Sequence, residues 1–165
     1  MSEKIIQTLR TSPLATFLNE AELRMLADCG RICEYPAGQD IVSTKNRDKR
    51  LFLLEKGKVD LHLNVLEKTG DCDGNAHIEL NTPGKLFGWA AWIRADRLEI
   101  SARAEDTVLA TVFDLECLRD GNHFLKLGYH MLELAYAYLQ EYGICPPNVQ
   151  ALSKFKKLQQ RIGET

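Results

Sequence analysis

Histidine, serine and acidic side chains carry much of protein chemistry, and in this sequence no spacing joins them into a catalytic set. No Ser/His/Asp set, P-loop or GxGxxG motif occurs. The histidines occur singly, without the HxH pair and following glutamate of a metal-binding barrel. They are His62, His77, His123 and His130. We therefore predict that the protein is not an enzyme and holds no metal.

The segment DCDGN at residues 71–75 has the alternating acidic side chains of a calcium loop. Such a loop needs a glycine near its middle and an acidic residue at its end. This chain has Ala76 and Thr82 at those two positions. We therefore interpret the segment as the tip of a hairpin.

The cysteines could form disulfides or a redox pair. Their number is odd and no CxxC spacing occurs, which favours reduced thiols over a disulfide framework. Cys29 and Cys33 are four residues apart and could form a redox or metal pair, but buried thiols of this kind are usually inert. We predict reduced, mostly buried thiols for all five, Cys29, Cys33, Cys72, Cys117 and Cys145.

The composition is that of one globular domain. The 165 residues are 27% charged and 45% hydrophobic, with a formal net charge of -2. These values exclude disorder and give no general attraction to nucleic acid or to acidic membranes. No apolar run approaches the roughly 20 residues of a membrane span, and residues 1–10 lack the apolar stretch of a secretory signal. We expect a cytoplasmic protein that does not contact a membrane.

The first unit, residues 1–30, has the pattern of two short helices. The first helix begins near Ser2, and Asn19 is a favourable N-cap for the second. The apolar side chains of the two helices are Ile5, Ile6 and Leu9, then Leu23, Met25 and Leu26.

The second unit, residues 31–114, consists of short apolar stretches separated by glycines and by Pro83. The stretches are residues 40–43, 51–54, 59–65, 78–80 and 107–113. Closely spaced strands of this kind favour a barrel or jelly roll over a βαβ sheet. We predict a mainly β fold, a double-stranded β-helix (jelly roll), flanked by the N-terminal helices and a long C-terminal helix.

The third unit, residues 115–142, has helical periodicity, with its long helix over about residues 123–142. Two apolar stripes run along this helix and together are wider than the roughly 100° that one packing face needs. We predict that one stripe packs on the barrel and the other forms a homodimer. The alternative is a helix buried more deeply within a monomer. The dimer stripe is Leu125, Gly128, Leu132, Ala135 and Leu139.

The fourth unit, residues 143–165, is a short basic tail with an amphipathic pattern. Fewer than twenty residues follow Pro147, too few for a helix-turn-helix and its support. We therefore recognise no DNA-reading motif and expect the tail to pack.

Several short stretches occur in a known order. Pro13-Leu14 and Phe17-Leu18 are followed by YPAGQDI at residues 35–41 and LFLLEKGKV at residues 51–59. PG at residues 83–84, LFG at residues 86–88 and ARAEDT at residues 102–107 complete the series. Over roughly residues 13–141 the series resembles the cyclic nucleotide-binding domain of Crp/Fnr-type regulators, kinase regulatory subunits and gated channels.

In that family a short cassette after the glycine holds the cyclic phosphate. Helical N–H groups and an arginine bind the phosphate, and a glutamate binds the ribose hydroxyl. The resemblance places the glutamate position at Trp89, the arginine position at Leu98 and the small residue after it at Glu99. Trp89 has no carboxylate and Leu98 has no charge. The resemblance therefore implies weak or absent binding of cAMP and cGMP, and we expect no cofactor.

Arg97 lies one position before the missing arginine. The strand pattern after it predicts two faces, with Leu98, Ile100, Ala102 and Ala104 on one and Arg97, Glu99, Ser101 and Arg103 on the other. Turning Arg97 inward would turn Glu99 and Arg103 inward too, so we predict that it faces outward. The alternative is a bulge at residues 95–97 that brings Arg97, or Arg94, back toward an anion.

Aromatic residues complete the candidate pocket. Trp89 and Trp92 could stack on a ligand base, but we favour indoles that fill the vacant pocket as core. Tyr129 and Tyr136 lie where the family closes over the purine, and simple packing is their alternative role. The candidate effector pocket is Phe87, Gly88, Trp89, Ala90, Trp92, Arg97, Leu98, Glu99, Tyr129 and Tyr136.

These observations lead to one hypothesis and two alternatives. The hypothesis is a non-catalytic regulatory or sensory module with an altered pocket, which answers to an unknown small-molecule effector or protein partner. In the first alternative, cAMP or cGMP binds through backbone amides and Arg97. In the second, the domain is a ligand-free dimerisation scaffold.

Overall fold

The computed structural model describes residues 2–43, 50–65, 75–88, 98–114 and Cys117, with the backbone alone at residues 65, 75, 76 and 98. The predicted helix of residues 123–142 and the tail lie outside this part of the chain. So does most of the loop at residues 71–75, whose last residue begins a strand. None of the described helices is long and apolar enough to cross a membrane.

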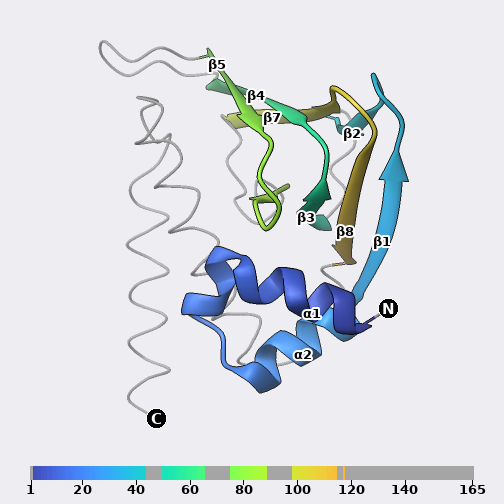
Figure 1. Ribbon diagram of the computed structural model, residues 1–165. Helices are drawn as coiled ribbons and strands as arrows, with labels where there is room; N and C mark the ends of the chain where they lie inside the picture. The colour runs from blue at the N-terminus through green and yellow to red at the C-terminus, as the bar shows by residue number, and fades with distance from the viewer. Residues whose placement is uncertain (1, 44–49, 66–74, 89–97, 115–116, 118–165) are drawn as a thin grey trace.

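The helices come first in the sequence and form a layer beside the strands (Figure 1). Helix α1 spans Ser2–Thr11 and buries the three residues predicted for its apolar side, Ile5, Ile6 and Leu9. A turn of 3-10 helix, η1, spans Pro13–Thr16, and α2 spans Glu20–Asp28. Both predicted helices are therefore confirmed, and η1 is an addition that Pro13 begins at its first position.

Helix α2 begins at a capping box. The Asn19 side chain accepts a hydrogen bond from the Glu22 N–H at 2.8 Å, and the Glu22 carboxylate accepts one from the Asn19 N–H at 2.9 Å. Met25, one of the three apolar residues predicted for this helix, is 41% exposed. The helical period turns Leu23 and Leu26 toward the core and leaves Met25 on the outer side.

Within the described residues, eight strands form two antiparallel sheets of four strands each. The first sheet has the order β1-β8-β3-β6, with strands Gly30–Tyr35, Val108–Asp114, Arg50–Lys56 and Leu86–Phe87. The second has the order β2-β7-β4-β5, with strands Asp40–Val42, Leu98–Ala104, Val59–Val65 and Asn75–Leu80. The mainly β prediction is confirmed. The apolar stretches did not predict β1, which mixes charged and half-buried residues, or β6, which has two residues.

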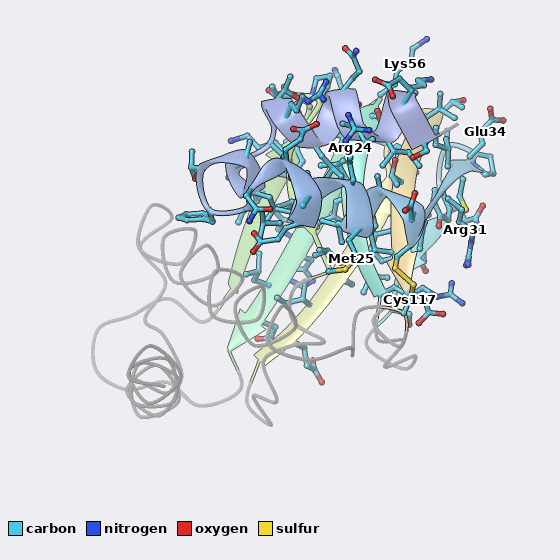
Figure 2. All side chains as sticks on the ribbon, turned by 90° about the horizontal axis from the view of Figure 1, so that it is seen from below. Arg24, Met25, Arg31, Glu34, Lys56 and Cys117 are labelled. Atoms are coloured by element: carbon cyan, nitrogen blue, oxygen red, sulfur yellow. A yellow bond between two sulfur atoms is a disulfide. The ribbon has the colours of Figure 1, made fainter. Side chains whose placement is uncertain are left out.

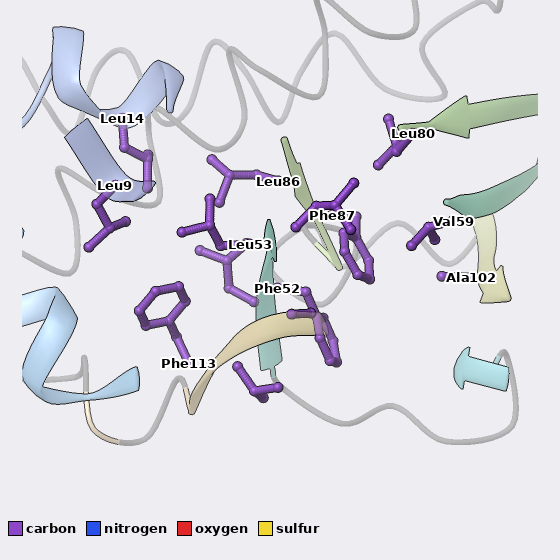
Figure 3. Packing of buried hydrophobic residues seen from close by; sticks show 14 of the residues in the cluster. Leu9, Leu14, Phe52, Leu53, Val59, Leu80, Leu86, Phe87, Ala102 and Phe113 are labelled. Carbon is purple, nitrogen blue, oxygen red and sulfur yellow. The ribbon is translucent and has the colours of Figure 1, made fainter. Parts of the chain in front are cut away.

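The two middle strands of the first sheet, β8 and β3, are buried on both faces. Four consecutive residues of β3, from Leu51 to Leu54, are at most 3% exposed. Figure 3 shows Leu53 and Leu86 on the side of Leu9 and Leu14, next to the stacked rings of Phe52 and Phe87. The helical layer therefore covers one face of this sheet, and the other face belongs to the interior of the roll.

A partly buried polar contact attaches α1 to this sheet. Thr8 of α1 donates a hydrogen bond to Glu55 of β3 at 2.5 Å. Thr111 of β8, which is fully buried, donates to the other oxygen of the same carboxylate, also at 2.5 Å. A buried hydroxyl that has a charged partner avoids the cost of an unpaired polar group. Glu55 thus joins a helix and two strands at one point.

The second sheet is buried on one face. In β7 the exposed fractions are 6% at Ile100, 1% at Ala102 and 1% at Ala104, whereas Glu99 and Arg103 are exposed and Ser101 is half-buried. The predicted alternation along this strand is therefore confirmed for these residues. A strand with this pattern has one face on the core and one in solvent.

The structure corrects the prediction that all the cysteines are reduced. Cys29, at the end of α2, and Cys117, after β8, form a disulfide, with Cα atoms 5.9 Å apart (Figure 2). The β1–β8 register brings the two residues together, since it pairs Gly30 with Phe113. No local spacing of cysteines predicts a pair that is 88 residues apart in sequence. Cys33 is a free thiol, and Cys72 and Cys145 lie outside the described residues.

Candidate ligand pocket

The candidate pocket begins at β6, which pairs with β3 through Phe87 and Phe52. The rings of these two residues are stacked, with centroids 4.9 Å apart and planes 11° apart. The ring of Tyr35 in β1 lies edge-on to the Phe52 ring, with the ring centroids 6.5 Å apart. The Tyr35 side chain is partly buried, and this burial, together with the nearby Cys33, raises the pKa of its hydroxyl group. Three aromatic rings, one from each of three strands, therefore form a row that ends at Phe87, the first residue of the candidate pocket.

Gly88 follows this row in a conformation that favours glycine. Its φ is +82°, and a Cβ atom built on it would lie 2.7 Å from Phe52 Cδ2 and 2.8 Å from the Arg50 carbonyl oxygen. Both distances are too short for real atoms. The chain can therefore leave β6 only through a residue without a side chain. The resemblance places the phosphate-binding cassette directly after this glycine.

Four of the predicted pocket residues lie in the segment between Gly88 and β7, outside the described residues. They are Trp89, Ala90, Trp92 and Arg97. The backbone of Leu98 begins β7 and pairs with Val65 of β4. Tyr129, Tyr136 and the five residues of the dimer stripe also fall outside the described part. Of the ten predicted pocket residues, the structure therefore describes Phe87, Gly88 and Glu99 and the backbone of Leu98. Phe87 and Gly88 are consecutive residues at the end of β6.

Glu99 lies on the outer face of the second sheet. It pairs with Asn64 of β4, whose side-chain amide donates a hydrogen bond to the Glu99 carboxylate at 3.5 Å. The next residue, Ile100, is buried. The Glu99 carboxylate therefore points away from the interior. An anion bound in the interior would not be repelled by it at close range.

The outer face of the same sheet has a polar cluster that the sequence did not predict. His62 of β4 and His77 of β5 are directly paired, and their rings are stacked with centroids 4.4 Å apart. His77 Nδ1 lies 3.2 Å from a carboxylate oxygen of Asp60. Desolvation and the carboxylate of Glu79 raise the pKa of Glu105 nearby. No group of three or more described His, Cys, Asp or Glu side chains is arranged to hold a metal ion.

The interior of the described part is apolar. The buried polar or charged residues among those described are Ser12, Glu22 and Thr111. Ser12 and Glu22 cap η1 and α2, and Thr111 binds Glu55 beside α1. No buried cation of the described strands faces the space between the two sheets.

No protein-family model and no curated protein sequence matches the chain. Solved structures do match. A regulatory subunit of a cAMP-independent protein kinase A from Trypanosoma brucei is 18% identical, with a TM-score of 0.61 over 93% of this chain and 51% of that chain. A variant of that subunit, in which a glutamate and a valine become alanine and a threonine becomes arginine, was solved with cAMP. It is 18% identical, with a TM-score of 0.63 over 98% of this chain and 51% of that chain.

Two bacterial structures are similar as well. The catabolite activator protein of Thermus thermophilus is 24% identical, with a TM-score of 0.59 over 79% of this chain and 59% of that chain. A putative cyclic nucleotide-binding protein from Geobacter metallireducens is 21% identical, with a TM-score of 0.57 over 80% of this chain and 92% of that chain. This chain spans about half the length of the kinase subunits. Helices before two four-stranded sheets, a glycine turn after β6 and these matches together show that the chain has the fold of the cyclic nucleotide-binding domains.

Proposed function

We propose that this domain is a non-catalytic regulatory module whose pocket binds cAMP and cGMP weakly or not at all. The observation that carries the proposal is the apolar character of β7 and its neighbours. The buried positions Ile100, Ala102 and Ala104 continue the face to which the alternation assigns Leu98. A cyclic phosphate placed against this face would meet no cation from the described residues of β7.

The size of the expected effect decides the outcome in a cell. Removing a charged partner from a buried phosphate costs about 2–5 kcal/mol. Each 1.4 kcal/mol is a factor of ten in the dissociation constant, so a micromolar site becomes a millimolar one. We therefore expect negligible occupancy by cyclic nucleotides at physiological concentrations.

The match to the Trypanosoma brucei subunit favours the same interpretation. That protein is described as cAMP-independent, and its variant with an added arginine is bound to cAMP. A domain of this fold therefore occurs in the regulatory subunit of a kinase that is cAMP-independent. In our proposal the effector of this chain is another small molecule or a protein partner.

Thermal unfolding with cAMP and cGMP tests the proposal. A ligand at one hundred times its dissociation constant raises the free energy of unfolding by about 2.7 kcal/mol, which shifts the midpoint visibly. We expect no saturable shift at micromolar nucleotide. A saturable shift at that concentration overturns the proposal. If Arg97→Ala then removes the shift, the displaced arginine of the first alternative is the cause.

A gain of function gives the reciprocal test. Trp89→Glu with Leu98→Arg restores the two charged contacts, and titration calorimetry should then detect cAMP. The matched control is Trp89→Glu with Ser101→Arg, which adds the same charges but places the arginine on the outer alternation of β7. If both variants fold and bind alike, the assignment of Leu98 to the arginine position is wrong.

We further propose that the module is a homodimer through the stripe Leu125, Gly128, Leu132, Ala135 and Leu139. Leu132→Glu would place a charge in an apolar seam and should halve the molecular mass measured by light scattering. Lys126→Glu introduces the same side chain outside the stripe and is the control. Equal masses for Leu132→Glu and the parent would contradict a dimer at this helix. A dimer unaffected by any ligand would instead favour the scaffold alternative.

A further inference from the structure

The disulfide lies at a junction of the chain. Cys29 is the C-cap of α2 and directly precedes β1, and its N–H donates a hydrogen bond to the Leu26 carbonyl. Cys117 follows the end of β8, and its N–H donates to the Asp114 carbonyl at 3.1 Å. The bond therefore joins the helical layer to the point where the chain leaves the roll (Figure 2).

The roll does not depend on this bond for its closure. β1 and β8 are already joined by a continuous register of six residue pairs, from Gly30 with Phe113 to Tyr35 with Val108. β8 is joined in the same way to β3 on its other side. The disulfide adds one attachment beyond the last pair of the ladder. We therefore expect its loss to release Cys117 and to leave the strands in place.

The two cysteine residues differ in their exposure to solvent. Cys117 is exposed, whereas Cys29 is half-buried and packs against the core cluster. A thiolate from solution can therefore reach the sulfur of Cys117 more easily. Accessible disulfides are the ones that exchange with thiols, and in compartments kept reduced by glutathione such bonds are transient.

We propose that Cys29 and Cys117 form a reversible thiol–disulfide site, which fastens Cys117 to the end of α2 when oxidised and releases it when reduced. Low-molecular-weight thiols of the glutathione class and their disulfides are the reactants. The site makes the attachment of Cys117 to the end of α2 dependent on the redox state. It is independent of any ligand in the pocket.

The reaction balances in two steps. A glutathione thiolate attacks the sulfur of Cys117, the protein S–S bond breaks, and its electron pair leaves on the sulfur of Cys29, which takes up a proton. A second glutathione thiolate then attacks the glutathione sulfur of the mixed disulfide and releases Cys117 as a thiolate, which is protonated in turn. One protein disulfide and two thiols have become two protein thiols and one glutathione disulfide. Oxidation is the reverse reaction.

Cys33 provides a matched control. It lies in β1, four residues from Cys29, and is a free half-buried thiol. Cys33→Ser removes a thiol from the same region without touching the proposed pair. Cys29→Ser and Cys117→Ser each remove the pair and should mimic the reduced state under oxidising conditions.

The experiment equilibrates the full chain in glutathione buffers of graded potential, blocks free thiols with a maleimide and digests without reduction. Mass spectrometry should find the linked Cys29–Cys117 peptide in oxidising buffers and both blocked peptides in reducing ones, in one two-electron transition. Hydrogen exchange on the same samples should show several-fold faster exchange at the Cys117 amide after reduction, with the β1 and β8 amides unchanged. Cys33→Ser should behave like the parent.

Three outcomes would each overturn the proposal. The linked peptide could fail to form in oxidising buffer, in which case there is no such site. Exchange at Cys117 could be the same in both states, in which case the bond fastens nothing. Reduction, Cys29→Ser and Cys117→Ser could all accelerate exchange along β1 and β8, in which case the bond is a structural cross-link and not a reversible attachment.

Discussion

The two sheets of the roll differ in what covers them. The sheet β1-β8-β3-β6 has the helical layer on one face and the interior on the other, so consecutive residues such as Phe52 and Leu53 are both buried. The sheet β2-β7-β4-β5 has the interior on one face and a polar outer face with Glu99 and Arg103. The segment that the family uses for ligand contacts leads from the first sheet into the second.

This difference explains why the pocket question can be argued from β7. A strand with one solvated face has a strict alternation, and a slip of one residue would exchange its buried and exposed sides. A strand buried on both faces gives no such constraint, because either register buries apolar side chains. The parity of β7 therefore fixes the inward positions, while the parity of β3 could not have done so.

The largest expected effects are in β3, where both of two neighbouring residues should be costly to truncate. Phe52→Ala and Leu53→Ala each remove a side chain that is at most 3% exposed, one on either face of the strand. Deletions of this size in a core reduce the free energy of unfolding by about 2–5 kcal/mol. Urea denaturation measures both. If only one of the two is costly, the first sheet is not covered on both faces.

A smaller and one-sided effect is expected in β7. Ile100→Ala leaves a cavity in the core and should cost about 2–4 kcal/mol. Its neighbour Glu99 is exposed, and Glu99→Ala should change the free energy of unfolding by no more than about 0.5 kcal/mol. Urea denaturation of the two variants compares their losses in the free energy of unfolding. Similar losses at both positions would remove the parity argument for our proposal that Leu98 faces inward.

The sequence predicted much of this architecture and missed particular parts of it. Periodicity and caps located α1, α2 and the longer strands, because local pattern determines such elements. The turn at Gly88 was not predicted, although only a residue without Cβ fits against Phe52 there. The strand β1 and the disulfide were missed, because each depends on which distant segment packs beside it. Pairing across 88 residues has no local signature.

A third effect concerns the helical cover of the first sheet alone. Asn19→Ala removes the cap of α2 and one side of its capping box, and should cost about 1 kcal/mol. Asn81→Ala, in the exposed turn after β5 of the second sheet, is the control. Thermal unfolding compares the two variants. An equal loss at both sites would mean that the cap of α2 contributes nothing particular to the cover.

The smallest effect is electrostatic and joins the two helices of the cover. Arg10 of α1 donates a hydrogen bond to Glu20 of α2, and with the charges of Arg10 and Arg24 this lowers the pKa of the Glu20 carboxyl from 4.5. Because the folded-state pKa lies below that of the unfolded chain, the stabilisation is present above the unfolded value and is lost as the pH falls through the folded one. Glu20→Gln should therefore reduce the free energy of unfolding slightly at pH 7, and the difference from the parent should shrink below about pH 4.5. High salt should shrink it too, because both side chains are exposed. Glu34→Gln removes an exposed carboxylate of β1 outside this contact. If the two variants differ from the parent in the same way at every pH, the ion pair between α1 and α2 is not the cause.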